Sequence, residues 1–537
     1  MKRNKVSVSL QSKRATLLSY ALIALAGALG ITIPAPNGQA QKSGATFSPQ
    51  IPKTWDEAAL TEWATPFAGL NQRPTHISAS EYYALPVENL RTYPVYFPGR
   101  EPEGYWEMIQ KVGPQPLIEP EKLKNEADWV EAGRRVFDEA DILHLRTFDP
   151  KFIAEARDRA LLEEARIRPM PDGTAGGMRW VPTKRGVALS FANCSFCHTR
   201  TRVLPDGASI PGGPFATIAP RWPETFKRWP IIFRLQFESR VLVGAPPFFM
   251  GQEPIGEWLY RAYGVPWKKD DLNERLKTLT KTEFEELDLA YRASGGVPRW
   301  NGSLYYPAKT PDLIGIKDRK YIDHTATHLH RGIGDLMRYA AMVSFAETAA
   351  FGPHQMLGKE TRRVQARLSD EALYALALYI YSLKPPRNPN PFDEKAKAGE
   401  KIFAREGCAA CHTPPLYTNN KLTLAEGYTP TKGAPPTLDI LPLSVGTDPG
   451  LALATRKGTG YYKVPSLKGL WYRGHFLHDG SVTSLEEMFD PDRLKDTHVA
   501  GGWSPPRVKT RAINGHEFGL RLSAEERAEL IVFLRTL

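Results

Sequence analysis

The stretches Cys194-Ser-Phe-Cys197-His198 and Cys408-Ala-Ala-Cys411-His412 decide how this chain is interpreted. They hold all four cysteines of the 537-residue sequence, and both have the form Cys-x-x-Cys-His. This motif is typical of covalent c-type haem attachment, in which two thiols bond to the porphyrin edge and the histidine binds the iron. The sequence therefore predicts two covalently bound haem c groups, with His198 and His412 as proximal iron ligands.

Two other kinds of site contain Cys-x-x-Cys, a redox disulfide and a zinc site. A thioredoxin-like disulfide does not need the histidine that follows each motif. A zinc site would gather Cys194, Cys197, Cys408 and Cys411 around one ion and leave both histidines without a role. Two complete motifs with no spare cysteine favour haem.

The N-terminus predicts a secretory signal over residues 1–40. Five basic residues precede or border an apolar stretch from Ala15 to Ile33, and small residues follow at Gly38 and Ala40. The alternative is an uncleaved membrane anchor, because the apolar stretch approaches the length of a spanning helix. We expect a periplasmic or secreted protein without stable membrane insertion after signal cleavage.

The charge balance is mildly basic, with 70 Lys and Arg against 59 Asp and Glu. An excess of this size in a chain of this length does not indicate nucleic-acid binding. The 46 prolines and 43 glycines predict much loop between the regular elements.

The sequence repeats itself beyond the two motifs. Lys309-Thr-Pro311-Asp-Leu313-Ile-Gly315 matches Lys463-Val-Pro465-Ser-Leu467-Lys-Gly469. The same alignment pairs 319 with 473 and 324 with 478, a constant offset of 154 positions that joins two arginines and two histidines. Upstream of the motifs, Ala132-Gly133 to Phe137 resembles Ala398-Gly399 to Phe403.

Each repeat ends in a predicted helix, 369–383 in the first and 523–537 in the second. Both helices begin at a serine that follows Arg-Leu, and Ser523 with Glu526 has the spacing of a capping box. Apolar residues then recur at helical spacing in the second, at Leu530, Phe533, Leu534 and Leu537.

We therefore predict a mainly α fold of two tandem cytochrome c-type domains with loop-rich insertions and an N-terminal extension. The extension covers 41–125, the first domain 126–385 (the first half) and the second 386–537 (the second half). The first half contains a charged, helical insertion at 152–167 and a stretch rich in proline and aromatic residues between 213 and 300. The proline-rich segment 384–391 is the predicted linker.

Val464-Pro-Ser-Leu-Lys-Gly, His475-Phe-Leu-His-Asp-Gly-Ser481, Thr483-Ser-Leu-Glu-Glu487 and the closing helix resemble bacterial dihaem cytochrome c peroxidases. This superfamily includes MauG-type maturation enzymes and haem rubber oxygenases. The resemblance covers about 130–537. It implies two haems in electronic contact, one in the N-terminal domain that activates H2O2 or O2 and one in the C-terminal domain that relays electrons. It also implies a Ca2+ ion between the domains and an electron donor such as a cytochrome or a cupredoxin.

By the same resemblance, the second axial ligand of the C-terminal haem comes from the loop before the final helix. Here that loop is Ile513-Asn-Gly-His516-Glu-Phe-Gly519, so His516 is the expected ligand in place of the usual methionine. The alternative is a histidine on a surface loop. In the first half Arg362 takes the equivalent place, with His354 and Met356 nearby, so no sixth ligand is assigned there.

Trp300, His328 and Glu347 are candidates for catalytic residues in the first half. His324, His328 and His330 are unusually close together in sequence, yet buried structural roles are the ordinary alternative for such residues. Arg319 and Arg473 occupy matching positions and are expected to bind haem propionates, because arginine suits planar carboxylate contacts.

Three functions remain open at this point. The first is a peroxidase-like enzyme that reduces H2O2. The second is an oxygenase that uses O2 on an apolar organic substrate, as in the rubber oxygenases. The third is an electron carrier without a substrate of its own.

Overall fold

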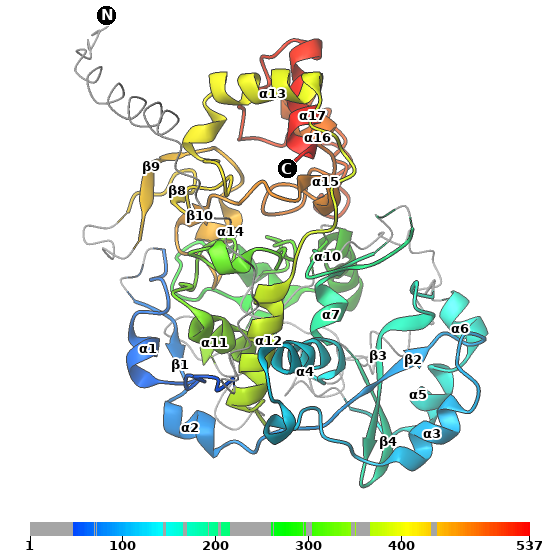
Figure 1. Cartoon of the computed structure of the whole chain (residues 1–537). Coiled ribbons are helices and arrows are strands. Elements are labelled where there is room, and N and C mark those ends of the chain that lie inside the picture. Colours follow the sequence, from blue (N-terminus) through cyan, green and yellow to red (C-terminus); the bar gives the residue numbers. More distant parts are fainter. Residues whose placement is uncertain are drawn as a thin grey trace, which may run out of the picture. The chain divides into compact units, whose positions relative to one another are not determined.

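The computed structural model describes residues 47–68, 70, 72–142, 146–164, 169–191, 193–201, 204, 206–214, 259–260, 263–293, 295–296, 303–344, 349–350, 366–430 and 438–537 (Figure 1). Residues 47–537 form one compact unit. The predicted signal at 1–40 lies outside the described residues. The boundaries at 125 and 385 remain predictions.

The described part of the chain contains helices of very different lengths. The α-helices are α1 (Glu57–Thr61), α2 (Ala79–Ala84), α3 (Tyr105–Val112), α4 (Glu126–Glu139), α5 (Pro150–Glu155), α6 (Arg159–Glu164), α7 (Cys194–Cys197), α10 (Lys281–Ala293), α11 (Ile333–Ser344), α12 (Asp370–Ser382), α13 (Glu394–Arg405), α14 (Gly450–Leu453), α15 (Leu470–Arg473), α16 (Leu485–Met488) and α17 (Ala524–Arg535). The 3-10 helices are η1 (Pro120–Lys122), η4 (Leu272–Thr278), η5 (Ile316–Asp318), η8 (Cys408–Ala410) and η9 (Pro491–Leu494).

The strands form small sheets. They are β1 (Thr75–His76), β2 (Tyr93–Tyr96), β3 (Thr174–Thr183), β4 (Gly186–Phe191), β5 (Thr199–Arg200), β6 (Ile210–Pro211), β7 (Ala349–Ala350), β8 (Leu422–Leu424), β9 (Ile440–Ser444) and β10 (Tyr461–Lys463). Their orders are β1-β7, β2-β3-β4, β5-β6 and β10-β8-β9, and among these described strands only the β8–β9 pairing is parallel.

One helix crossing occurs in both halves. Helix α4 packs on α12, and α13 packs on α17 (Figure 1). A Cβ atom at Gly133 would overlap the carbonyl oxygen of Ala375, and one at Gly399 would overlap that of Glu529. Ala375 and Glu529 are equivalent residues of the two repeats, so each glycine allows the same close backbone approach.

Matching aromatic contacts accompany the two crossings. The rings of Phe137 and Tyr379 lie 5.3 Å apart with an interplanar angle of 56°, and those of Phe403 and Phe533 lie 5.4 Å apart at 60°. The internal repeat read from the sequence is therefore also a repeat of packing.

The two closing helices begin as predicted. Ser369 caps α12 by accepting a hydrogen bond from the N–H of Ala372. Ser523 and Glu526 form the predicted capping box at α17. The helices end a residue or two before 383 and 537, which is ordinary fraying at a C-terminus.

The N-terminal extension is part of the first-half core. Trp55, Trp63 and Tyr82 are fully buried and share one apolar cluster with residues of α4 and α12. The Trp63 indole N–H donates to the carbonyl oxygen of Leu329 at 3.1 Å. The extension has no readable motif because its role in packing depends on residues far away in the sequence.

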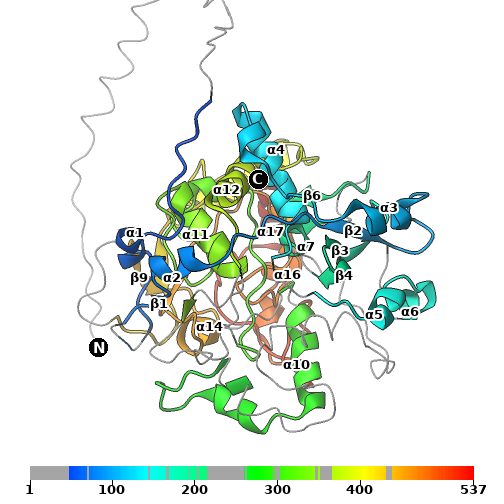
Figure 2. The same cartoon turned by 90° about the horizontal axis from the view of Figure 1, so that it is seen from below.

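The region around the predicted helical insertion combines helices with a sheet. The charged segment forms the two short helices α5 and α6, and the strands β3 and β4 that follow make an antiparallel hairpin with β2 at its edge (Figure 2). Trp180 of β3 is fully buried with Val95, Ile109 and Leu162 from the neighbouring elements.

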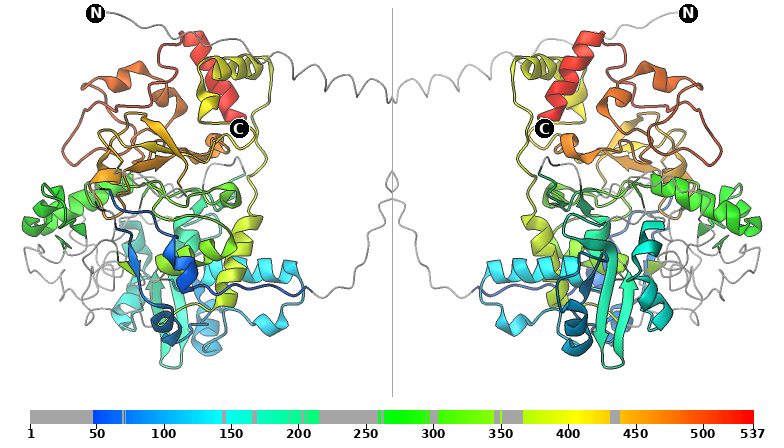
Figure 3. Two further views of the ribbon diagram at one scale, coloured as in Figure 1. Left: turned by 90° about the vertical axis from the view of Figure 1, so that its left-hand side faces the viewer. Right: turned by 90° about the vertical axis from the view of Figure 1, so that its right-hand side faces the viewer.

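Residues 383–393 contain no helix or strand and join α12 to α13 as an extended connection (Figure 3). They include the predicted linker. Asn388 and Asn390 both donate side-chain hydrogen bonds to the carbonyl oxygen of Arg535, at 2.8 and 3.2 Å. The linker therefore contacts the end of α17.

None of the helices that the structure describes combines the length and apolar character needed to cross a lipid bilayer.

Candidate functional site

The second Cys-x-x-Cys-His motif lies directly after α13. Gly407 ends the helix in the left-handed conformation, with φ of 74°, and starts the short helix η8 that carries Cys408. The N–H of His412 donates to the carbonyl oxygen of Cys408 at 2.8 Å. This turn brings both cysteines and the histidine to the wall of one cavity.

The His412 imidazole is oriented by a backbone carbonyl. Its Nδ1 lies 3.1 Å from the carbonyl oxygen of Pro465 and 3.3 Å from that of Tyr417. A carbonyl can only accept, so Nδ1 carries the proton and Nε2 keeps its lone pair. Metal-binding histidines are commonly held in this way. Burial lowers the pKa of His412, which keeps the ring neutral.

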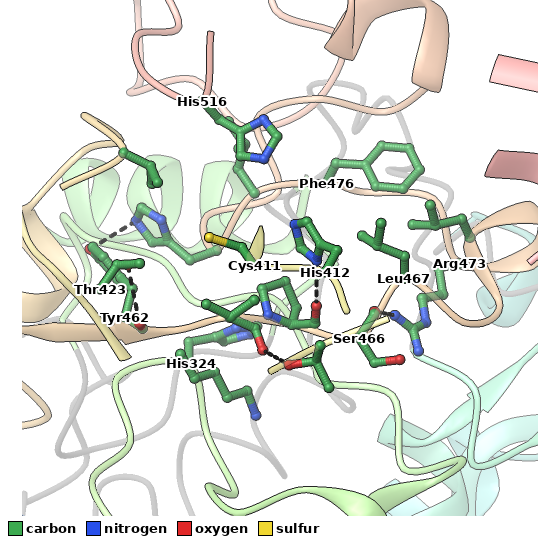
Figure 4. Close-up of a pocket in the computed structure, with 18 of the residues that line it drawn as sticks. His324, Cys411, His412, Thr423, Tyr462, Ser466, Leu467, Arg473, Phe476 and His516 are labelled. Atoms are coloured by element: carbon green, nitrogen blue, oxygen red, sulfur yellow. Dashed lines mark hydrogen bonds between the residues drawn. The ribbon is translucent and has the colours of Figure 1, made fainter. Parts of the chain in front are cut away.

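The ring of His516 faces that of His412. The ring centroids lie 6.3 Å apart and the planes are inclined by 54° (Figure 4). The two rings are close enough for His412 and His516 to hold one metal ion between them, at the usual metal–imidazole distance of about 2 Å. Burial, with help from nearby His412 and Arg493, lowers the pKa of His516 to about 4.

The loop that carries His516 is held by its backbone. The N–H of His516 donates to the carbonyl oxygen of Val445 at 2.6 Å. Fully buried Arg493 donates to the carbonyl oxygens of Ile513, Gly515 and His516 at 2.5, 2.8 and 2.9 Å. Gly515 packs so closely on Gly446 that a side chain would not fit between them.

Cys408, Cys411, His412 and His516 line a cavity of about 270 Å³. Apolar side chains form part of its wall, among them Phe403, Leu470, Met488, Phe518 and Leu534. Another part of the wall is cationic and draws on both halves, with Lys309, Arg319, Lys463 and Arg473. An apolar cavity with cations on one part of its wall suits a flat apolar group that carries carboxylates, which describes haem.

The cations of the wall are held in matching ways. Arg319 donates to the carbonyl oxygens of Asp312 and Ile314, and Arg473 to the carbonyl oxygen of Ser466 at 2.6 Å. Arg473 also forms an ion pair with the Asp312 carboxylate at 2.7 Å. Both arginines expected at propionates therefore lie at the cavity of the second motif.

The two halves meet through an exchanged pair of hydrogen bonds. The N–H of Lys309 donates to the carbonyl oxygen of His478, and the N–H of Lys463 donates to that of His324, both at 3.0 Å. Lys309 is equivalent to Lys463, and His324 to His478, so each half offers the same donor and the same acceptor to the other.

The first motif shares a main-chain turn with the second, because the N–H of His198 donates to the carbonyl oxygen of Cys194 at 3.0 Å. Asn193 caps the short helix α7 by accepting from the N–H of Phe196. Nδ1 of His198 lies 3.2 Å from the carbonyl oxygen of Pro311. Pro311 is the repeat equivalent of Pro465, so both motif histidines are oriented by the same residue of their own half.

The three neighbouring histidines of the first half lie in different surroundings. His324 lines the cavity and donates through Nε2 to the carbonyl oxygen of Lys309 at 2.9 Å. His328 is fully buried beside Trp63, with its Nε2 3.4 Å from that of His76. His330 contacts Tyr381.

Trp300 and Glu347, the other catalytic candidates, lie outside the described residues, as do His354, Met356 and Arg362. Within the described ranges, no three or more His, Cys, Asp and Glu side chains are gathered as a metal ion would require. The four cysteines of the zinc alternative are therefore not gathered around one ion. The Ca2+ ion that the resemblance implied stays a prediction.

The cysteines of the second motif are poorly suited to thiolate chemistry. Burial raises the pKa of Cys408 to about 11, and it also raises that of Cys411. Redox-active thiols have lowered pKa values, so the disulfide alternative gains no support from this environment.

Sequence reasoning missed the two lysines of the wall and the proline carbonyls behind the histidines. Lys309, Pro311, Lys463 and Pro465 all stand in the repeated segment, so the matched positions were the available signal. The role of the prolines could not be predicted, because every residue has a backbone carbonyl. The role of the lysines could not be predicted, because each lysine contacts the opposite half.

No family model matches the chain. Over 148 residues it is 28% identical to the methylamine utilization protein MauG of Methylorubrum extorquens. The match covers 26% of this chain and 34% of that protein, so the chain spans about a third of the length of this relative.

Two solved structures are also similar in part. One is a hydrazine synthase of Kuenenia stuttgartiensis, with a TM-score of 0.27 and 15% identity over 44% of this chain and 73% of that one. The other is a MauG-like protein associated with microbial copper homeostasis, with a TM-score of 0.27 and 18% identity over 48% and 89%. The sequence match to MauG agrees with the superfamily resemblance carried by the motifs.

Proposed function

We propose that this chain is a periplasmic dihaem c-type oxidoreductase related to MauG and the cytochrome c peroxidases, built from two tandem cytochrome c-type domains. The observation that carries the proposal is the duplicated histidine geometry. Each Cys-x-x-Cys-His motif places its histidine against the carbonyl oxygen of the equivalent proline, Pro311 or Pro465.

The residues present fit two haem c groups. Cys194 and Cys197 would attach the first and His198 would bind its iron, while Cys408, Cys411 and His412 would do the same for the second. Bound haem supplies an iron that changes oxidation state, with a potential set by its axial ligands and surroundings.

The two sites are proposed to have different tasks. In the second half, His412 and His516 would fill both axial positions, which leaves no place for a substrate and suits electron transfer. In the first half no second ligand is assigned, so that site is proposed to activate H2O2 or O2. Electrons would come from a small donor such as a cytochrome or a cupredoxin.

An oxygenase of an apolar organic substrate is the second candidate. The facing pair of His412 and His516 favours it over a peroxidase, because the peroxidases of this superfamily typically place a methionine opposite the histidine of the C-terminal domain. A pure electron carrier, the third candidate, would need two six-coordinate haems.

The chain should be produced in a host that matures c-type cytochromes and exports them. Intact-mass analysis should show two haems added covalently to the cleaved chain, and Cys408→Ala with Cys411→Ala should remove one of them. Bare apoprotein from such a host would contradict the proposal.

Spectroscopy of the same material separates the three candidates. We expect one low-spin and one high-spin ferric signal in the EPR spectrum. Rapid turnover of H2O2 with a reduced cytochrome would identify a peroxidase, and a stable dioxygen complex would identify an oxygenase. Two low-spin signals, without H2O2 turnover and without a dioxygen complex, would identify an electron carrier.

A further inference from the structure

Two buried lysines have so far been described only as part of the cavity wall, with no ligand assigned to them. Lys309 and Lys463 line the cavity that also holds Cys411, His412 and His516. Lys309 belongs to the first half, although this cavity surrounds the motif of the second half. An amine at such a place is costly unless an anion compensates its charge.

Backbone carbonyls are the hydrogen-bond acceptors for both ammonium groups. Nζ of Lys309 donates to the carbonyl oxygen of His475 at 2.6 Å. Nζ of Lys463 donates to the carbonyl oxygens of Ile322 and Tyr321 at 2.8 and 3.2 Å. His475 and Tyr321 are equivalent residues of the two repeats, so each lysine reaches the same point of the opposite half.

Neither lysine forms an ion pair with a carboxylate of the described residues, since the nearby carboxylates are engaged elsewhere. Asp312 pairs with Arg473 and accepts from Tyr472 at 3.2 Å. Asp323 accepts hydrogen bonds from Thr327, and Asp479 accepts from Ser481. Both lysines therefore lie at the cavity wall without an ion-pair partner among the described residues.

The electrostatics agree with this geometry. Burial, assisted by the nearby charge of Arg473, lowers the pKa of Lys309 to about 7. Burial and Arg319 likewise lower the pKa of Lys463 to about 7. An anion bound beside the two lysines would reverse part of this penalty and keep both amines charged.

We propose that Lys309 and Lys463 form, with Arg319 and Arg473, a carboxylate-binding site for the acidic edge of the porphyrin held at Cys408, Cys411 and His412. This inference rests on the proposed function, because the carboxylates are those of a haem. It goes beyond that function by assigning Lys309 of the first half to the cofactor of the second half.

The test is the reduction potential of the low-spin haem in the holoprotein, measured by optical spectroelectrochemistry. Oxidised haem carries one more positive charge than reduced haem, so removal of a nearby cation favours the oxidised form. Lys309→Gln and Lys463→Gln should each shift the potential to a more negative value. Lys309→Arg, which keeps the charge, should shift it much less.

Lys320→Gln is the matched control. Lys320 lies next to Arg319 in the sequence but pairs at the surface with Asp439 at 2.6 Å, so its loss should leave the potential unchanged. If a glutamine variant does not accumulate, Lys309→Met or Lys463→Met replaces it in the experiment, because methionine keeps an aliphatic stem of similar length.

The outcomes are distinct. If Lys309→Gln and Lys463→Gln both have the reduction potential of the unmodified protein, the inference is overturned. The proposed function still stands in that case, provided that the intact mass shows two haems. A shift confined to the high-spin haem would overturn the assignment across the halves. Absence of covalent haem would overturn both the function and the inference.

Discussion

His412 and His516 face each other across the cavity of the second motif, with 6.3 Å between their ring centroids. The first is oriented by the carbonyl oxygen of Pro465, and the second is carried by a loop fixed to Val445 and Arg493. Two separate parts of the second half thus present imidazoles to the same space.

Replacement of His516 should open one axial position. We expect His516→Ala to convert the low-spin haem to a high-spin one and to leave the other haem unchanged, as seen by EPR and optical spectra. Met488 also lines the cavity and supplies the control, because Met488→Leu should keep the low-spin signal. A low-spin signal that is kept in His516→Ala and lost in Met488→Leu would identify Met488 as the ligand.

Arg493 is expected to act as a positioning residue for His516. It holds three carbonyl oxygens of the 513–516 loop, so Arg493→Gln should let the loop move and give a mixture of low-spin and high-spin haem. A pure loss of folding stability would lower the unfolding midpoint without changing the spin state. The surface variant Arg535→Gln should leave both quantities unchanged.

Gly399 should resist substitution because α13 and α17 touch there through their backbones. Gly399→Ala would favour the helical backbone by about 1 kcal/mol. The new Cβ overlaps the carbonyl oxygen of Glu529, however, and overpacking of this kind costs about 1–3 kcal/mol or more. We expect net destabilisation in urea unfolding.

Glu400→Ala is the control for that prediction, since Glu400 is exposed on the same helix. It should change the free energy of unfolding by less than about 0.5 kcal/mol. Equal stability of the two variants would show that the helices are not in contact at Gly399.

The buried pair of His76 and His328 should make the folded state sensitive to acid. Burial, with a contribution from His328, lowers the pKa of His76 to about 3, and burial with nearby Lys457 lowers that of His328 to about 3. An unfolded histidine titrates near 6.5, so between these values the unfolded chain binds protons that the folded protein excludes. The free energy of unfolding therefore falls as the pH decreases below about 6.5.

His328→Gln should reduce this dependence by at most about 1.4 kcal/mol per pH unit. The quantity to compare is the slope of the urea-unfolding free energy between pH 6.5 and 4, because the substitution also changes packing. An unaltered slope would mean that His328 is charged in the folded protein or does not titrate in this range.

The parts of the fold that the sequence predicted well depend on local signals. Ser523 and Glu526 lie three residues apart and cap one helix, so their pattern is visible without tertiary structure. The hairpin of β3 and β4 escaped notice because Trp180 is buried by partners from several other elements. The packing of Trp55 and Trp63 was hidden for the same reason.

The residues of the candidate site also fall into two groups, those that the sequence predicted and those that only the fold reveals. The motif residues stand out by residue type and spacing, and His516 stands out as the histidine of the loop before the final helix. Lys309 escapes because the cavity it lines belongs to the second half, a fact that only the folded chain reveals. Pro311 and Pro465 escape because their contribution is a main-chain oxygen.

The exchange of hydrogen bonds between Lys309 with His478 and Lys463 with His324 has the form that a two-fold axis generates in a homodimer. The two halves of one polypeptide thus form the kind of symmetric contact that two copies of a smaller protein would form in a homodimer. A fragment that ended near the linker would lack His478, the acceptor for the N–H of Lys309. Such a fragment is expected to dimerise, with Lys309 of each copy donating to the carbonyl oxygen of His324 in the other.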